Sequence, residues 1–280
     1  MSDATPRSGS VAVSGLRLHY LDWGGESEVP ALALHGFGLN CRSWDEVAPG
    51  LRSHLRVHAL DQRGHGLSDW GEKLEDYTRD SMVRDIEGVV DSLGLSRLAV
   101  IGHSMGGLNA MTFAARNPLK VRALVLVDVG PEVSVDGAKQ VAYFVAGPYE
   151  LGTLEDWVEY THEYYPWRSK ERIRSRLEVS LRQTESGRFA KQYDERFRQA
   201  FDGIAESSES LWDVALRLRC PTLLLRGGSS PVLPLQLARE FERRVGCVRL
   251  VSIEGAGHSV AGDKPAEFVK AVSAFLSEVL

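Results

Sequence analysis

The sequence predicts an α/β fold, with a mostly parallel, doubly wound sheet of eight strands, an antiparallel hairpin at its N-terminal edge and an inserted helical cap. Short runs of continuous apolar character alternate with helical segments along most of the chain. Such runs are typical of strands that helices cover on both faces. Their alternation with helices implies parallel strands joined by crossover connections. The alternation is interrupted once, between about Gly130 and Val214, which indicates an insertion.

The first element is the hairpin. Apolar and polar residues alternate from Ser10 to Trp23 on both sides of Ser14 and Gly15, which predicts two antiparallel strands joined by a tight turn. The apolar runs that follow predict strands at 31–36, 56–61, 97–102, 121–129, 221–227 and 247–253. Helical spacing predicts helices at about 44–53, 77–93, 104–116, 234–245 and 264–278.

The insertion divides the chain into a core, formed by residues 1–130 and 215–280, and a cap at 131–214. The cap segment is rich in Trp, Tyr, Arg and Glu and shows helical spacing but no strand pattern, so we expect an all-helical cap. Ligands of doubly wound sheets bind at the carboxyl ends of the strands. A cap inserted at that edge would cover the site.

Composition excludes several classes of protein. The formal net charge of −5 and the isoelectric point of about 5.9 leave no basic surplus for a nucleic-acid partner. The three cysteines are odd in number, far apart in the sequence and without C-x-x-C spacing, which suggests neither a disulfide framework nor a zinc site, so we expect buried thiols and a reducing compartment. No segment is apolar enough for a signal peptide or a membrane span. We expect a cytoplasmic monomer or homodimer without membrane contact.

The segment "VIGHSMGGLNA" is the strongest functional signal. It places Ser104 between Gly102 and Gly106, with an apolar strand before it and a helical stretch after it. This strand–turn–helix context is the one that the G-x-S-x-G nucleophile motif requires. The sharp turn would strain the serine backbone and expose its hydroxyl at the positive end of the following helix. We predict that Ser104 is a nucleophile.

With this motif the chain resembles the α/β-hydrolase superfamily, and the resemblance covers nearly everything outside the cap. Three further stretches are similar to that family: "LALHGFG" after the third strand, "DQRGHGLSD" after the fourth, and "GAGHS" near the end. The resemblance implies an α/β-hydrolase fold, a catalytic triad and no cofactor.

A serine hydroxyl needs a base, and His258 is the predicted one. It follows the last strand on a glycine-rich loop, which places it at the same sheet edge as Ser104. His103 lies inside the motif and points away from the exposed side of Ser104, although substrate contact remains open to it. His35 and His65 stand in glycine turns and brace loops. No pair of histidines has metal-ligand spacing, so no metal is expected.

The acid of the triad departs from the family pattern. In many α/β-hydrolases an aspartate follows the strand after the cap, but here Ser230 occupies that position in "RGGSSPVLP". Asp128 ends the strand before the cap and emerges at the same edge, so we predict that it steadies the histidine. Asp263 and Glu254 are the alternatives, and Asp263 is also suited to begin the last helix. This combination resembles a subgroup that includes acetamidomethylene succinate hydrolase.

Two backbone N–H groups would hold the oxyanion that forms when a carbonyl is attacked. The resemblance implies Met105, which follows the nucleophile, and Phe37 in "HGFGLN", where glycines let the backbone approach closely. The candidates for substrate contact are mainly residues of the cap. They are His103, Phe144, Trp157, Tyr165, Trp167 and Arg168, the last as a partner for a substrate carboxylate.

These residues predict a cofactor-independent serine hydrolase of a small carboxylic ester, lactone or activated amide, acting through an acyl-enzyme. Three alternatives stay open. The same triad could hydrolyse a carbon–carbon bond of a diketone, the serine site could act as a cofactor-free peroxidase, or the pocket could only bind a ligand, as in a receptor.

Overall fold

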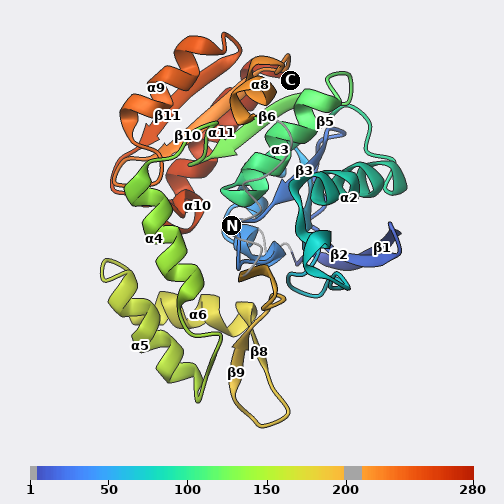
Figure 1. Ribbon diagram of the computed structural model, residues 1–280. Coiled ribbons are helices and arrows are strands. Elements are labelled where there is room, and N and C mark those ends of the chain that lie inside the picture. Colours follow the sequence, from blue (N-terminus) through green and yellow to red (C-terminus); the bar gives the residue numbers. More distant parts are fainter. Residues whose placement is uncertain (1–4, 199–209) are drawn as a thin grey trace.

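The computed structural model describes residues 5–198 and 210–280 and contains an eight-stranded sheet with the order β1-β2-β4-β3-β5-β6-β10-β11 (Figure 1). β1 and β2 are antiparallel, β2 is antiparallel to β4, and the remaining neighbours are parallel. The strands are β1 (Arg7–Val13), β2 (Leu16–Asp22), β3 (Pro30–Leu34), β4 (Arg56–Leu60), β5 (Leu98–His103), β6 (Val121–Val127), β10 (Thr222–Gly227) and β11 (Val248–Ile253). The predicted fold class is confirmed, including the hairpin at one edge.

The hairpin turn uses two residues with positive φ. Ser14 has a φ of 52° and Gly15 a φ of 81°, and Val13 pairs with Leu16 across the turn. Positive φ at both central residues twists the chain in the sense that matches the flanking strands. The turn therefore fixes the register of β1 against β2, in which Ser10 pairs with His19.

Alternate residues of the central strands face opposite sides of the sheet. Leu32 of β3 and Val100 of β5 pack in one apolar cluster, while Ala33 and Ile101 pack in the other. The helices that contribute to the first cluster are α2 (Arg79–Ser92), α3 (Met105–Arg116), α8 (Leu211–Leu216) and α9 (Leu235–Arg244). Those that contribute to the second cluster are the 3₁₀ helix η1 (Cys41–Trp44), α1 (Ala48–Leu51), α10 (Val260–Asp263) and α11 (Pro265–Val279). Helices on both faces explain why the strand sequences are almost continuously apolar.

Two predicted helices differ from the observed ones. The segment predicted as one helix at 44–53 is divided into η1 and α1, with Pro49 in the first turn of α1. Before the last helix, Asp263 ends α10, and Lys264 occupies the N-cap position of α11. The expectation that Asp263 begins the last helix is therefore wrong; its carboxylate is used in another contact, described below.

The cap contains α4 (Val135–Ala146), α5 (Leu154–Tyr164) and α6 (Lys170–Ser180), which lie with β8 and β9 at one end of the molecule (Figure 1). The expectation of helices alone is wrong, because β7 (Glu150–Leu151), β9 (Phe189–Lys191) and β8 (Leu181–Gln183) form a small antiparallel sheet. Strands of two or three residues are too short to show an alternating pattern. Part of the predicted cap, residues 199–209, lies outside the described residues.

The core contributes one further short element, the 3₁₀ helix η2 (Leu74–Tyr77), before α2. Within the described ranges, every helix is too short or too polar to span a lipid bilayer. Cys41 and Cys220 are buried and Cys247 is half-buried, each as a free thiol.

Candidate active site

Ser104 stands at a sharp turn between β5 and α3. Its φ of 52° and ψ of −120° lie in a region that residues with a side chain rarely adopt. The flanking glycines make the turn possible: a Cβ on Gly102 would lie 2.5 Å from the carbonyl oxygen of Gly106, and one on Gly106 would lie 2.4 Å from that of Leu34. The spacing in the sequence therefore reflects contacts between backbone segments that leave no room for side chains. Ser104 itself is half-buried at the N-terminal end of α3.

Asp128 follows β6 and is completely buried. Its Oδ1 accepts a hydrogen bond from the backbone N–H of Gly227 at 2.8 Å. Its Oδ2 accepts from Nδ1 of His258 at 2.7 Å and from the hydroxyl of Ser230 at 2.5 Å. The φ of Asp128 is 51°, so its backbone shares the left-handed region with Ser104. The structure thus brings Asp128 and His258 into direct contact.

The tautomer of His258 follows from this contact. Because a carboxylate oxygen only accepts, Nδ1 carries the proton, and Nε2 is left as the acceptor that a general base requires. The His258 side chain remains 20% exposed, unlike the Asp128 side chain behind it. Ser104 and His258 line the same cavity.

Ser230, at the position where the resemblance implied an aspartate, donates its hydroxyl to the carboxylate of Asp128, which directly follows β6. The loop that carries Ser230 is held by Arg226 at the end of β10. The guanidinium donates through Nε to the carbonyl of Leu233 at 2.8 Å and through a terminal nitrogen to that of Gly228 at 3.1 Å. Both ends of the loop are therefore fixed beneath the cavity.

His103 precedes the serine and contacts the base. Its Nε2 donates to the backbone carbonyl of His258 at 3.0 Å, and the two ring centroids are 4.8 Å apart. Burial holds the pKa of His103 well below its ordinary value, so the ring is neutral. His103 positions the segment that carries His258, and it also lines the cavity.

The loop after β3 lies directly against the serine turn. A Cβ on Gly36 would lie 2.7 Å from Nδ1 of His103 and 3.3 Å from Cβ of Ser104. Phe37 is buried, with its ring packed on Tyr193 and Phe197 at centroid distances of 5.1 and 5.3 Å. The structure thus brings the backbone of Phe37 next to the turn.

The second predicted oxyanion donor, Met105, is the first residue of α3. The first N–H groups of a helix have no acceptor within the helix, so the N–H of Met105 is suited to stabilise negative charge near Ser104.

A cavity of about 330 Å³ opens above Ser104. Core and cap both contribute to its wall. The lining residues are Gly36, Phe37, Leu39, His103, Ser104, Gln140, Val141, Tyr164, Tyr165, Trp167, Ser229, Pro231, Val232, Gly257, His258 and Ser259. Of the predicted cap contacts, Tyr165 and Trp167 are among them. Gln140 and Val141 of α4, and the segment 229–232, were not predicted, because helical spacing does not tell which face of a cap helix meets the core.

Two of the other predicted contacts, Trp157 and Arg168, do not line this cavity. Trp157 is buried inside the cap, where its Nε1 donates to the carbonyl of Phe189 at 2.8 Å. Arg168 stacks on Tyr165, 4.2 Å from the ring centroid, and binds Asp263 through Nε at 2.7 Å. The side chain of Phe144 lies outside the described part of the chain.

The alternative acids are placed elsewhere. Besides Arg168, Asp263 accepts a hydrogen bond from the backbone N–H of Gly257 at 2.8 Å, beside the loop of His258. Glu254 is exposed to solvent. Asp263 therefore ties the cap to the loop that carries the base, and Asp128 is the carboxylate in contact with His258.

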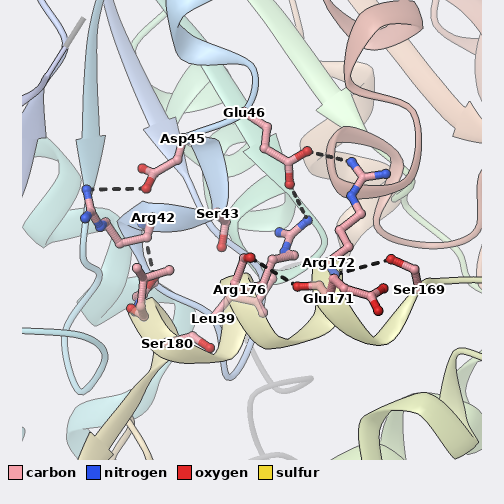
Figure 2. A pocket seen from close by; sticks show the side chains of 13 residues that line it. Leu39, Arg42, Ser43, Asp45, Glu46, Ser169, Glu171, Arg172, Arg176 and Ser180 are labelled. Carbon is pink, nitrogen blue, oxygen red and sulfur yellow. Dashed lines mark hydrogen bonds and ion pairs between the residues drawn. The ribbon is translucent and has the colours of Figure 1, made fainter. Parts of the chain in front are cut away.

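A second hollow, of about 490 Å³, lies between α6 of the cap and the segment around η1 (Figure 2). Glu46 bridges the two sides, because its carboxylate is 2.5 Å from a guanidinium nitrogen of Arg172 and 3.5 Å from one of Arg176. Asp45 pairs with Arg42 at 3.3 Å, and burial raises the pKa of Asp45 to about 6. Charged side chains therefore hold this part of the boundary between cap and core.

Comparison with known proteins identifies the family of the fold. A family model described as the alpha/beta hydrolase fold matches residues 30–265. An esterase of Mycobacterium tuberculosis is 33% identical over 273 residues, which cover 95% of this chain and 86% of the esterase. The 2-hydroxy-6-oxo-2,4-heptadienoate hydrolase of Pseudomonas putida is 28% identical over 254 residues, covering 89% of each protein.

Among solved structures, E-2-(acetamidomethylene)succinate hydrolase superposes with a TM-score of 0.87 at 24% sequence identity, covering 98% of this chain and all of that one. The predicted likeness to that enzyme is therefore confirmed for the fold. Together with the match to the family model over residues 30–265, the fold and the sequence establish that this chain belongs to the α/β-hydrolase family.

Proposed function

We propose that the protein is a serine hydrolase that cleaves small, uncharged carboxylic esters or closely related acyl compounds. One observation carries the proposal: Nδ1 of His258 is 2.7 Å from the buried carboxylate of Asp128, and the same histidine opens into a cavity with Ser104 on a strained turn. Nucleophile, base and acid in this order are the recurring constellation of acyl transfer.

In the proposed reaction Nε2 of His258 removes the proton of the Ser104 hydroxyl as its oxygen attacks the carbonyl carbon. The backbone N–H groups of Phe37 and Met105 stabilise the oxygen that becomes negative, and Asp128 stabilises the imidazolium. His258 then returns the proton to the leaving alcohol, which departs and leaves an acyl group on Ser104. Water, deprotonated by His258, releases the acid and restores the serine.

The size and lining of the cavity support an uncharged substrate. Its volume of about 330 Å³ is at the lower end of the range of small-molecule pockets. Among the described residues that line it, there is no lysine, arginine, aspartate or glutamate. Arg168, predicted to hold a substrate carboxylate, binds Asp263 with a guanidinium nitrogen at 2.6 Å. A short acyl chain against Phe37, Val141 and Trp167 therefore fits better than a dicarboxylate.

The experiment is turnover of p-nitrophenyl esters with acyl chains from acetate to octanoate, using wild type, Ser104→Ala and a serine control. Ser92→Ala is the control, since Ser92 is exposed at the end of α2. Wild type and Ser92→Ala should hydrolyse the short esters, and Ser104→Ala should lose at least roughly 10⁴-fold in kcat. Equal rates in wild type and Ser104→Ala would refute a serine mechanism. Ligand binding without turnover would instead favour a receptor.

Carbon–carbon bond hydrolysis is the second candidate, favoured by the similarity to the Pseudomonas putida hydrolase along 89% of both chains. The same residues would serve it, so only substrates can separate the two. Cleavage of a vinylogous diketone by wild type with a kcat/KM above that of every ester would favour this candidate. A peracid assay with peroxide and acetate tests the predicted peroxidase alternative in the same way.

A further inference from the structure

Three side chains that can bind a metal gather outside the cavity above Ser104. They are His19 of β2, Cys41 at the start of η1 and Asp61 just after β4. Nδ1 of His19 is 2.8 Å from Oδ2 of Asp61 and 3.9 Å from Sγ of Cys41. The three donor atoms lie within 4.8 Å of one another, and all three residues are buried.

The three residues are buried, but they border a hollow through which a metal ion could reach them. The three side chains form part of the wall of a hollow of about 370 Å³, together with Ser8 and Asn40 among others. None of the residues that line it also lines the cavity above Ser104. An ion entering from this hollow would reach the cluster without passing through the candidate active site.

Surrounding hydrogen bonds already orient two of the three side chains, those of Asp61 and His19. The backbone N–H of Cys41 donates to Oδ1 of Asp61 at 2.6 Å, and that of Leu67 donates to Oδ2 at 2.9 Å. Nε2 of His19 is 2.9 Å from the hydroxyl of Ser8. Metal-binding histidines almost always use their second ring nitrogen in this way, and such partners fix the ring.

We propose that His19, Cys41 and Asp61 form a binding site for one divalent transition-metal ion of the zinc class, with water from the hollow as the fourth ligand. Thiolate, imidazole and carboxylate are the donors that Zn²⁺ takes in proteins, and a site with three protein ligands leaves one position open. Tetrahedral bonds of these lengths separate the donor atoms by about 3.4–3.6 Å. The nitrogen–sulfur distance must therefore shorten slightly, and the nitrogen–oxygen distance must lengthen.

Binding of the metal ion releases one proton to solvent. The Cys41 thiol loses its proton to solvent, and the thiolate binds the ion. The His19 proton moves from Nδ1 to Nε2, where it is donated to the hydroxyl of Ser8, while Nδ1 binds the ion. Asp61 exchanges the hydrogen bond from His19 for a bond to the metal. No oxidation or reduction takes place, and metal affinity falls as the pH falls.

Occupation of this site would affect the hydrolase. Cys41 follows the segment 36–40, which contains Phe37, and Asp61 begins the loop that contains His65. Nε2 of His65 accepts a hydrogen bond from the backbone N–H of Gly38 at 3.2 Å. Drawing Cys41 and Asp61 closer together shifts the segment 36–40 and the loop that contains His65. These two segments hold the backbone of Phe37, the proposed oxyanion donor. The ion is therefore an inhibitor that lowers kcat and leaves KM nearly unchanged.

The binding test does not depend on the activity. Chelator-treated protein is titrated with Co²⁺, whose bond to a thiolate gives an intense near-ultraviolet absorption, and Zn²⁺ is then added to displace it. Wild type should bind one Co²⁺ with this absorption, and Cys41→Ser should lose it. Cys220→Ser is the matched control, because Cys220 is a buried free thiol outside the cluster, and it should behave as wild type. His19→Gln should weaken binding by roughly tenfold or more.

Further measurements separate the outcomes. X-ray absorption of zinc-loaded wild type should show one sulfur ligand. A coordination shell of nitrogen and oxygen alone would overturn the proposal. This measurement uses only wild type, so it does not depend on the folding of the variants. His258→Ala should bind the ion as wild type does; if it does not, the ion binds at the catalytic histidine and the proposed site is wrong. With esters as substrate, Zn²⁺ should lower the kcat of wild type and Cys220→Ser but not that of Cys41→Ser. Loss of esterase activity in every sample would refute the proposed function and leave the binding result standing.

Discussion

The hydroxyl of Ser230 donates a hydrogen bond to Oδ2 of Asp128, the same carboxylate oxygen that accepts from His258. The loop after β10 therefore supports the contact between Asp128 and His258, while the carboxylate itself comes from the residue that follows β6. Because β6 and β10 are neighbouring parallel strands, their carboxyl ends bring both side chains to the same point. This arrangement makes separate predictions for the two residues.

Replacing Asp128 with asparagine should lower kcat by roughly 10³- to 10⁴-fold with little change in KM. The amide can donate to Nδ1 of His258, which places the proton on Nε2 and removes the base. Asparagine tolerates the left-handed backbone of this position, so the fold should persist. Steady-state kinetics of Asp128→Asn with p-nitrophenyl acetate check this, with circular dichroism as the control. Wild-type kcat in this variant would show that another group supports His258.

Replacing Ser230 with alanine should have a smaller effect. The loss of one hydrogen bond to a charged, buried group costs about 1.5–3 kcal/mol in stability. We expect a fall in kcat of roughly tenfold, because Asp128 keeps its contacts with Gly227 and His258. Urea unfolding and initial rates of Ser230→Ala measure the two effects. A loss as large as that of Asp128→Asn would mean that Ser230 has a direct part in the reaction.

A methyl group on Gly36 should disturb the oxyanion loop and leave the core intact. The added Cβ would lie 2.7 Å from Nδ1 of His103, closer than van der Waals contact, so the loop or the ring must move. We expect kcat of Gly36→Ala to fall by roughly 10- to 10³-fold, the range for a misplaced oxyanion donor. Gly246→Ala is the matched control, since its Cβ meets nothing within 4 Å. Similar activity in both variants would place the oxyanion donor elsewhere.

The buried His65 should make the protein sensitive to acid. Burial lowers the pKa of His65 to about 3, far below its ordinary value of 6.5. Its neutral form is therefore favoured by folding, and the associated stability is present above pH 6.5 and is lost as the pH falls toward 3. At pH 5 the loss relative to pH 7.5 amounts to about 2 kcal/mol.

Urea unfolding at pH 7.5 and pH 5.0 measures this loss. His65→Gln keeps an acceptor for the N–H of Gly38 without a titrating ring, so its free energy of unfolding should fall by about 2 kcal/mol less than that of wild type over this interval. An identical fall in both proteins would assign the acid sensitivity to other groups, such as the buried His35 and His103.

The sequence predicts the sheet well, and it predicts which residues lie together at its edge, for a physical reason. The parallel strands are covered on both faces, so their apolar runs are long and unmistakable, and each ends at the edge where Ser104, Asp128 and His258 lie. Even the contact between Asp128 and His258 could be predicted, because "VD" ends an apolar run next to the strand that precedes Ser104. In these strands the apolar run in the sequence also marks where the strand ends in the sheet.

The cap and the proposed metal site could not be predicted in the same way. The short strands β7, β8 and β9 depend on pairing with one another, and Trp157 and Arg168 are positioned by partners far away in the sequence. His19, Cys41 and Asp61 come from three separate segments, and no metal-binding motif in the sequence links them. Their proximity results from the register of β2 against β4, which a pattern of apolar residues does not specify.

The backbone of Ser104, with φ 52° and ψ −120°, is costly for any residue that has a Cβ, by about 1–3 kcal/mol. Ser104→Gly should therefore be inert toward esters and yet melt at a higher temperature than wild type, by about 2–4 °C for each kcal/mol that is relieved. The wild-type protein would then be the active but thermally less stable of the two. Calorimetry of both proteins would measure how much thermal stability the strained, reactive serine costs.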